Sequence, residues 1–540
     1  MNKFSGALSL LDIFIGQKME EYHTPGLAIA ITDREQLLHL STYGKADIVA
    51  NIPVTPETLF PIASVSKSFT SIALLQLHEA GQLDLHAPVT EYLPWFKVKS
   101  AYEPITVHHL LSHTAGIITG RDFTPSSRYE AVALAETEAT SPRGEYFHYS
   151  NVGYKLLGCL LEDLIGKNYG DILRQRILQP LGMINTEPVI THETRNRLAV
   201  GYQRFYDDRP FSRNYPLVPA TWLEYGAGDG SIASTPADMA VYLRMLLNKG
   251  RTPSGQIISK DSFNLIIQQL IKIDELVDNY YGYGLAIGKF NNRNYIFHDG
   301  EMSGHLSNIT IDLDNGLGVL VLCNRPGNPF EISKQALQLV ESAFNERELP
   351  SLPAINNPIE IDNAADYAGS YLGDNKELTL LAENQHLILD YKGNRIILER
   401  RYGDSFYANH PDFALFLLTF KRSDNQVVEV FYRSEWYTSD RYTGPRSFNY
   451  PSEWLAYTGH YRSHNPWYSN FRIILRKDKL WIIYPVWGDG EVLVPMGNGV
   501  FRIGEDERSP ERIKFDTMIN ERALRANISG CDYYRTFNAD

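Results

Sequence analysis

An internal repeat in the last third of the chain constrains its fold more than any other feature. The segment "YAGSY" at Tyr367–Tyr371 returns as "YTGHY" at Tyr457–Tyr461, a period of 90 residues (457 minus 367). Each copy is followed by a strand pattern, a polar turn and a second strand pattern. Repeated short strands favour closed antiparallel barrels, because closure removes the unpaired edges of a sheet. We therefore predict one small antiparallel β-barrel over residues 363–445 and a second over residues 452–540.

The first two thirds of the chain predict a separate α+β domain over residues 1–348. Strand patterns occur at Gly26–Gly44 and again from about Tyr281, whereas the residues between them are mostly helical in pattern. Strands from both ends of a region, with helices between them, indicate a mostly antiparallel sheet covered by helices. A proline-rich stretch without periodicity, residues 349–362, is expected to link this domain to the barrels.

Two helices in the middle region carry capping signals. Thr106 is expected to cap a helix that stops at Gly116. Thr235 should cap another, with Pro236 at its first position and Asp238 as a capping-box partner.

Composition excludes several classes of partner. The 540-residue chain has a formal net charge of −13, so it lacks the basic excess that binds nucleic acids or anionic membranes. Its three cysteines, Cys159, Cys323 and Cys531, are too few and too dispersed for a disulfide framework. The N-terminal segment has helical spacing but no signal-peptide cleavage site, and no apolar run is long enough to span a bilayer. We expect a cytoplasmic protein without a membrane partner.

The segment "FPIASVSKSFT" places two hydroxyl residues and a lysine at the start of an apolar helix. Ser64 and Lys67 lie about one turn apart and should project on the same side, with Ser64 at the first residue of the helix. A serine hydroxyl becomes a nucleophile when a base takes its proton, and a buried lysine with a lowered pKa can be that base. The alternative is a helix-capping serine beside a solvated lysine, and the motif alone does not exclude it.

Two later segments add candidate groups of the same kind. In "FHYSNVGYKLLG", Tyr149 can act as a proton relay, and Asn151 can bond both the lysine and a substrate carbonyl. In "FHDGEMSGHLSNI", His298 can bond a substrate group, and Gly300 can let a substrate backbone approach a strand edge. Each segment taken alone is equally compatible with a purely structural role.

Together, and in this order, the three segments resemble the penicillin-recognising serine hydrolases. The resemblance is closest to the class C β-lactamase-like family and its D-aminopeptidase, D-alanyl carboxypeptidase and esterase relatives, and it covers roughly Leu10 to Glu346. It implies a β-lactamase/transpeptidase-like catalytic domain. A catalytic domain followed by two lipocalin-like barrels resembles the three-domain D-stereospecific aminopeptidases. In those proteins a barrel loop reaches the catalytic cleft, and the candidate loop here is Ser463–Asn470. The alternative, which we favour slightly, is that Trp467 and Tyr468 pack inside their own barrel.

The family roles carry over one residue at a time. The resemblance implies that Ser64 is acylated, that Lys67 accepts its proton or activates it electrostatically, and that Tyr149 is the base and leaving-group proton donor. Asn151 would hold the lysine and the substrate amide. Whether the lysine or the tyrosine is the working base stays open, since the two can titrate as a coupled pair.

The third motif departs from the family pattern. His298 and Gly300 stand where many members have Lys-Thr-Gly, and the oxyanion hole would use the backbone N–H groups of Ser64 and Glu301. An imidazole has a reference pKa of about 6.5 and is largely neutral at pH 7, so recognition of a free substrate carboxylate should weaken. Strict carboxypeptidase and β-lactamase activities are therefore less expected than aminopeptidase, amidase or esterase activity.

The sequence thus predicts a serine hydrolase acting on a small molecule or a short peptide, with amides or D-residue peptides first and small esters second. A β-lactamase or D-alanyl carboxypeptidase activity, and a non-catalytic sensor or scaffold, remain alternatives, as does a homo-oligomer. We expect no cofactor and no metal, because His108, His109 and His113 have no carboxylate or cysteine at ligand spacing.

Overall fold

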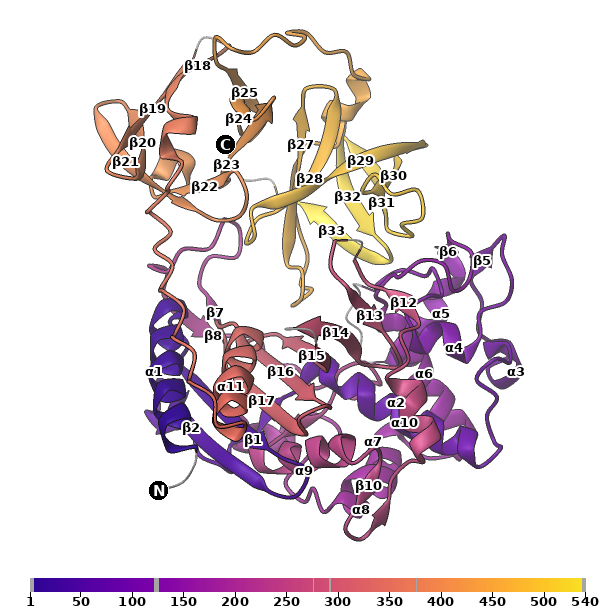
Figure 1. Ribbon diagram of the computed structural model, residues 1–540. Helices are drawn as coiled ribbons and strands as arrows, with labels where there is room; N and C mark the ends of the chain where they lie inside the picture. Colours follow the sequence, from indigo (N-terminus) through magenta and orange to yellow (C-terminus); the bar gives the residue numbers. More distant parts are fainter. Residues whose placement is uncertain (1–3, 121–125, 275, 291–292, 375, 537–540) are drawn as a thin grey trace. The chain divides into compact units, whose positions relative to one another are not determined.

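The computed structural model describes residues 4–120, 126–274, 276–290, 293–374 and 376–536 (Figure 1). Contacts within the chain define two compact units. The first unit comprises Met1–Gln203, Leu217–Pro353 and Arg508–Pro510. The second comprises Arg204–Pro216, Ala354–Glu507 and Glu511–Asp540. The α+β unit and the barrels are described separately below.

The first unit is built on a nine-stranded antiparallel sheet, as the sequence predicted. Strands from the two ends of the region meet where β1 pairs with β17, with Ile29 opposite Val321. Both strands are buried along their whole length, which explains their continuous apolar sequences. In sheet order the strands are β12 (Ile271–Lys272), β13 (Asn279–Tyr281), β14 (Ala286–Phe290), β15 (Arg293–Met302), β16 (His305–Asp312), β17 (Leu317–Cys323), β1 (Gly26–Thr32), β2 (Leu37–Asp47) and β3 (Ile52–Pro53).

Helices cover both faces of this sheet. On one face α1 (Ser5–Tyr22) lies beside α11 (Pro329–Phe344), and the two share a core with β1 and β17 (Figure 1). On the other face α9 (Pro236–Leu247) packs on the same strands. The helical region includes α2 (Ser66–Glu79), α3 (Val89–Tyr92), α4 (Val107–Leu111), α5 (Ser127–Ala133), α6 (Asn151–Ile165), α7 (Tyr169–Leu173), α8 (Gln179–Leu181) and α10 (Lys260–Ile266).

Four two-stranded sheets lie outside the large sheet. They pair β4 (Phe60–Pro61) with β9 (Ala233–Ser234), β5 (Lys99–Ser100) with β6 (Glu138–Ala139), β7 (Tyr202–Arg204) with β8 (Leu217–Pro219), and β10 (Arg251–Thr252) with β11 (Gly255–Gln256) among the described residues.

Both threonine caps are confirmed, but Asp238 does not complete the predicted capping box, since its carboxylate accepts from the Asn185 N–H and the Thr186 hydroxyl, and one helix ends earlier than predicted. The Thr106 side chain accepts a hydrogen bond from the His109 N–H, and the Thr235 side chain accepts one from the Asp238 N–H. The first of these helices stops at Leu111 rather than near Gly116. His113 has a φ of +58°, a left-handed conformation that the helix cannot include.

The second unit contains two closed eight-stranded antiparallel barrels, as the repeat predicted. Each barrel repeats one contact: Tyr371 Oη donates to the Tyr367 carbonyl over 2.9 Å, and Tyr461 Oη donates to the Tyr457 carbonyl over 2.8 Å. The first barrel consists of β18 (Gly369–Gly373), β19 (Lys376–Glu383), β20 (His386–Tyr391), β21 (Asn394–Arg400), β22 (Ser405–Ala408), β23 (Leu418–Ser423), β24 (Gln426–Tyr432) and β25 (Glu435–Thr438). The second consists of β26 (Gly459–Arg462), β27 (Asn470–Arg476), β28 (Lys479–Tyr484), β29 (Asp489–Gly497), β30 (Val500–Ile503), β31 (Arg512–Ile519), β32 (Arg522–Ile528) and β33 (Cys531–Arg535).

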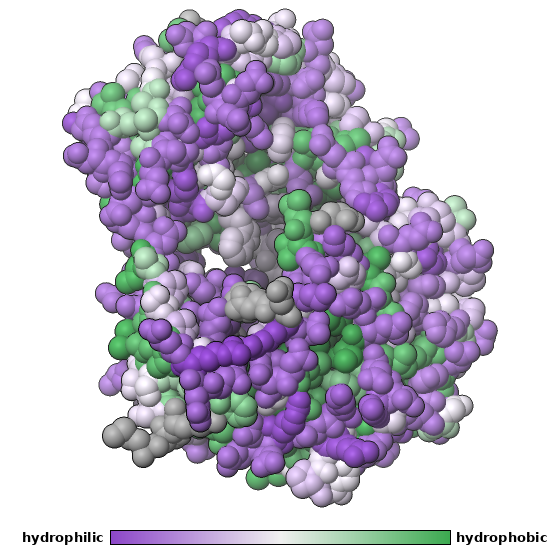
Figure 2. All heavy atoms as spheres, in the orientation of Figure 1, coloured by the Kyte–Doolittle hydropathy of each residue, from purple (hydrophilic) through white to green (hydrophobic). Residues whose placement is uncertain are grey.

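The face of the molecule in view is mostly polar. Figure 2 shows hydrophilic residues over most of the face in view, with apolar residues in smaller groups between them. Among the described helices, none combines the length and the apolar composition that a membrane span requires. Cys159, Cys323 and Cys531 all lie within the described residues, are buried and form no disulfide with one another.

Candidate active site

Ser64 lies in a tight turn just before helix α2. The turn is a single 3₁₀ segment, Ala63–Val65, and the α-helix begins at Ser66, so the prediction that Ser64 opens the α-helix is wrong by two residues. Ala63, directly before the serine, has a φ of +46°, which is unusual for a residue with a side chain. The Ile62 N–H donates to the Ile232 carbonyl over 2.9 Å and anchors the entry to the turn.

Lys67 occupies the first turn of α2 and is completely buried. Its Nζ donates to Ser64 Oγ over 3.0 Å, to Asn151 Oδ1 over 2.8 Å and to the Asp229 carbonyl over 2.8 Å. Burial lowers the pKa of Lys67 to about 7; the nearby Asp229 charge opposes this shift and the Lys155 charge assists it. A lysine with this pKa exchanges protons near neutral pH, and its closest hydroxyl is that of Ser64.

Tyr149 lies over the same lysine. Its ring centroid is 4.8 Å from Lys67 Nζ. Burial raises the pKa of Tyr149 above its usual range, although the nearby Ser64 hydroxyl opposes the shift. The phenol is therefore protonated at neutral pH and is a proton donor in the resting protein.

Helix α6 brings Asn151 to this cluster. Ser150 caps the helix by accepting a hydrogen bond from the Gly153 N–H over 3.0 Å, so Asn151 is the first helical residue. Its side chain is half-buried and accepts from Lys67, as the sequence led us to expect. Because the segment Tyr149–Asn151 leads directly into α6, the phenol and the amide reach the lysine together.

Strand β15 carries His298, which lies near Tyr149 but is bonded elsewhere. The two ring centroids are 6.3 Å apart. His298 Nε2 lies 3.0 Å from Tyr281 Oη, and Nδ1 lies 2.6 Å from the Asp299 carbonyl oxygen. Burial, together with the charge of Lys67, lowers the pKa of His298 to about 3. This imidazole is neutral. Both of its ring nitrogens contact Tyr281 or the Asp299 carbonyl rather than Ser64.

Gly300 is required by a contact within the protein. A Cβ at this position would lie 2.2 Å from the Ile62 carbonyl oxygen and 2.2 Å from Ser307 Oγ. The sequence predicted that another backbone comes close to this glycine, and the backbone just before Ser64 does so. The glycine thus lets β15 pack against the serine turn, and the exposed Glu301 follows it with its side chain paired to Arg325 over 2.8 Å.

Two groups at the site were not predicted from the sequence. The Asp229 carbonyl holds Lys67, while both Asp229 carboxylate oxygens accept from Tyr225 Oη over 2.8 and 2.9 Å. The fully buried His113 ring lies 4.3 Å from that of Tyr149, and His113 Nδ1 accepts from the Ser150 N–H over 3.0 Å. The small residues around Asp229 were the only sequence signal, and they indicate a close backbone approach.

Within the described ranges, no group of three or more His, Cys, Asp or Glu side chains is arranged to hold a metal ion.

Known proteins are similar to this chain over much of its first two thirds. The family model described as beta-lactamase matches residues 11–343. Penicillin-binding protein 4 of Amycolatopsis lactamdurans is 29% identical over 318 residues, which cover 56% of this chain and 82% of the relative. Protein flp of Staphylococcus aureus (strain NCTC 8325 / PS 47) is 28% identical over 331 residues, 58% of this chain and 62% of the relative's length.

Solved structures share the fold. An octameric penicillin-binding protein homologue from Pyrococcus abyssi matches with a TM-score of 0.58 and 28% identity, covering 80% of this chain and all of the other. The D-amino acid amidase of Ochrobactrum anthropi SV3 matches with a TM-score of 0.53 and 24% identity, covering 64% of this chain and all of the other. With a family model that spans more than half of the sequence, the chain belongs to the β-lactamase and penicillin-binding-protein-like family of serine hydrolases.

Proposed function

We propose that the protein hydrolyses amides or short peptides through an acyl-enzyme on Ser64. The observation that carries the proposal is the 3.0 Å contact between Ser64 Oγ and the fully buried Lys67, whose pKa is about 7. Near neutral pH a substantial fraction of this lysine is neutral and can accept the serine proton. The tyrosine phenol is less suited to that step, because the pKa of Tyr149 is raised and the group is already protonated.

The proposed reaction moves one proton from Ser64 to the leaving group through Lys67 and Tyr149. Neutral Lys67 takes the Ser64 proton as the oxygen attacks the substrate carbonyl, and the backbone N–H groups of Ser64 and Glu301 receive the oxyanion. Tyr149 then gives a proton to the leaving nitrogen, and the proton held by Lys67 restores the phenol. The amine departs, and a water attacks the acyl-enzyme by the same proton path in reverse.

The neutral His298 supports the choice among substrates. A cation at this position would favour a substrate carboxylate, whereas this imidazole is uncharged and bonded to Tyr281 and to its own strand. We therefore place aminopeptidase or amidase action, with D-residue substrates first, ahead of carboxypeptidase or β-lactamase action. Small esters are the second candidates, since the acyl-enzyme chemistry is shared.

A substrate panel tests this proposal. Wild-type protein is offered D- and L-aminoacyl amides, acyl nitrophenyl esters and a chromogenic cephalosporin, with Ser64→Ala as the control. We expect amide hydrolysis that is absent in the control. Cephalosporin turnover faster than amide turnover would contradict the substrate assignment, and ester turnover alone would move the protein to the esterase group. Inertness toward every compound would favour the sensor or scaffold alternative.

We also propose that the chain self-associates. The homologue from Pyrococcus abyssi is octameric, and the two proteins share fold and 28% sequence identity. Light scattering coupled to size exclusion measures the mass directly, and a monomer of 61.4 kDa at high concentration would contradict this proposal.

A further inference from the structure

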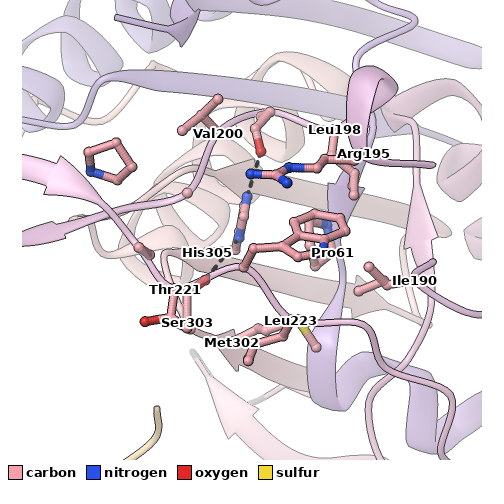
Figure 3. A pocket seen from close by; sticks show the side chains of 15 residues that line it. Pro61, Ile190, Arg195, Leu198, Val200, Thr221, Leu223, Met302, Ser303 and His305 are labelled. Atoms are coloured by element: carbon pink, nitrogen blue, oxygen red, sulfur yellow. Dashed lines mark hydrogen bonds between the residues drawn. The ribbon is translucent and has the colours of Figure 1, made fainter. Parts of the chain in front are cut away.

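A cavity of about 120 Å³ opens in the first unit beside the segments that carry Ser64 and Gly300. Figure 3 shows side chains around it from β4, from the end of β15, from the start of β16 and from the loop segments 190–201 and 219–223. A water-sized group needs about 10–15 Å³ of such space, so the cavity has room for a side chain of several heavy atoms. Its walls include Pro61, Ile190, Trp222, Leu223, Met302 and His305.

The chain itself limits the distance between this cavity and the nucleophile. Pro61 lies three residues before Ser64, and an extended chain spans at most about 3.6 Å per residue, so their Cα atoms are within about 11 Å. Met302 lies two residues after Gly300, within about 7 Å by the same rule. Gly300 in turn packs against the Ile62 carbonyl. The cavity therefore lies close to the turn that carries Ser64, with Pro61 and Met302 in its lining.

The lining is mostly apolar, and its polar side chains are those of Arg195, Thr221, Ser303 and His305. Ile190 and Met302 are almost fully buried, and Trp222 and Leu223 are half-buried. The buried His305 lies with Nε2 3.0 Å from the Ala199 carbonyl oxygen and Nδ1 3.3 Å from the Ser303 carbonyl oxygen. Burial lowers the pKa of His305 to about 4, so this wall is neutral at pH 7.

One charged group borders the cavity. Arg195 is exposed to solvent, and its guanidinium carbon lies 5.0 Å from the centroid of the Trp222 ring. An ion pair with such a solvated group contributes little, whereas a carboxylate pushed among apolar walls loses its hydration. An apolar side chain gains by leaving water. A lysine-like side chain would meet both the apolar walls and the like charge of Arg195.

We propose that this cavity receives the side chain of the acyl portion of the substrate and selects uncharged apolar groups, aliphatic or aromatic, of about leucine to phenylalanine size. The inference rests on the proposed acyl-enzyme on Ser64 and specifies the substrate class of that site. Trp222, Leu223 and Met302 are its specificity-determining residues.

A pair of nearly isosteric esters isolates the effect of charge. The 4-methylpentanoyl and succinyl nitrophenyl esters have acyl chains of similar shape, but one ends in two methyl groups and the other in a carboxylate. The acetyl ester, which has no side chain, reports basal acylation. After correction for spontaneous hydrolysis, we expect kcat/KM for the 4-methylpentanoyl ester to exceed that for the succinyl ester at least tenfold, within the roughly 10–200-fold range of apolar pockets.

Two different variants are used, so that the test still works if one of them does not fold. Leu223→Lys puts a cation on a half-buried wall and should lower the 4-methylpentanoyl-to-succinyl ratio at least tenfold. Trp222→Ala removes apolar surface and should lower the same ratio. Tyr129→Ala, an exposed aromatic truncation on α5, is the matched control and should keep the wild-type ratio.

The outcomes separate this inference from the proposed function. Acetyl ester hydrolysis that depends on Ser64, with a 4-methylpentanoyl-to-succinyl ratio of one or below, overturns the apolar subsite and leaves the acyl-enzyme proposal standing. A ratio that Leu223→Lys and Trp222→Ala leave unchanged assigns the preference to another surface and also overturns it. Absence of acetyl ester hydrolysis and of any covalent adduct on Ser64 overturns the proposed function and this inference together.

Discussion

Replacing Lys67 by methionine should make the first unit more stable at pH 6 while removing its reactivity. The side chain is fully buried, and burial lowers its pKa from 10.5 to about 7. Below pH 7 the lysine is charged in both the folded and the unfolded protein, so the folded protein bears the whole cost of burying the charge. Between pH 7 and 10.5 only the unfolded chain is protonated, so stability rises with pH until the cost disappears.

The size of the effect follows from the two pKa values. At about 1.36 kcal/mol for each pH unit between 7 and 10.5, the buried charge costs about 5 kcal/mol at low pH. Methionine removes that cost but leaves the acceptors on Asn151 and Asp229 without their donor, a loss of about 1–3 kcal/mol. We expect the variant to be more stable by about 2–4 kcal/mol at pH 6. Wild type should then gain about 3 kcal/mol relative to the variant between pH 6 and 9.

Pulse proteolysis after urea equilibration measures this difference, with peptides from α2 quantified by mass spectrometry so that the barrels do not contribute. Lys18→Met is the matched control. Burial alone would lower the pKa of Lys18, but its bonds to Glu21 and Glu331 raise the pKa overall, so this lysine stays charged throughout pH 6–9. The stability difference between wild type and this control should be flat over that range. Parallel pH dependences for wild type and Lys67→Met would refute the reasoning.

Three further outcomes follow from the same geometry. The kcat/KM of wild type should fall tenfold per pH unit below an apparent pKa of about 7, as Lys67 becomes protonated; a profile flat to pH 5 would count against this base. Gly300→Ala should reduce the rate of acylation at least 100-fold, because its Cβ would lie 2.2 Å from the Ile62 carbonyl oxygen, and near-wild-type kinetics would show that the strand can yield. Lys155→Met should cost about 3–5 kcal/mol in urea unfolding, since it leaves the buried Glu130 carboxylate without its cation, and a loss below 1 kcal/mol would contradict the pairing.

Local signals explain why much of the fold and the central residues could be predicted. The repeated Tyr-x-Gly-x-Tyr segments predicted the barrels because each copy makes the same tyrosine-to-carbonyl bond in its own barrel. Ser64 and Lys67 were found because a helical turn brings residues three apart together. Tyr149 and Asn151 were predicted only from the order of the three motifs along the chain. No local rule connects Ser64 with Tyr149, which lies 85 positions later.

The remaining features depend on contacts between distant segments. The Asp229 carbonyl bonds Lys67 only because a glycine-containing loop packs on α6, where a Cβ on Gly228 would lie 2.4 Å from the Tyr154 carbonyl oxygen. The segment Arg204–Pro216 belongs to the same unit as the barrels, and nothing in the composition of this segment predicts that. The bond between His298 and Tyr281 connects β15 to β13, which lies on the far side of β14 in the sheet, and the sequence does not define that register.

The most direct test of the account is covalent labelling of the intact protein with a fluorophosphonate, read by peptide mass spectrometry at pH 8. We predict one adduct, on the peptide that contains Ser64, lost in Ser64→Ala and reduced at least 100-fold in rate in Lys67→Ala. A folded wild-type protein that takes up no label, or takes it up on another residue, would contradict the claim that a buried lysine activates this serine.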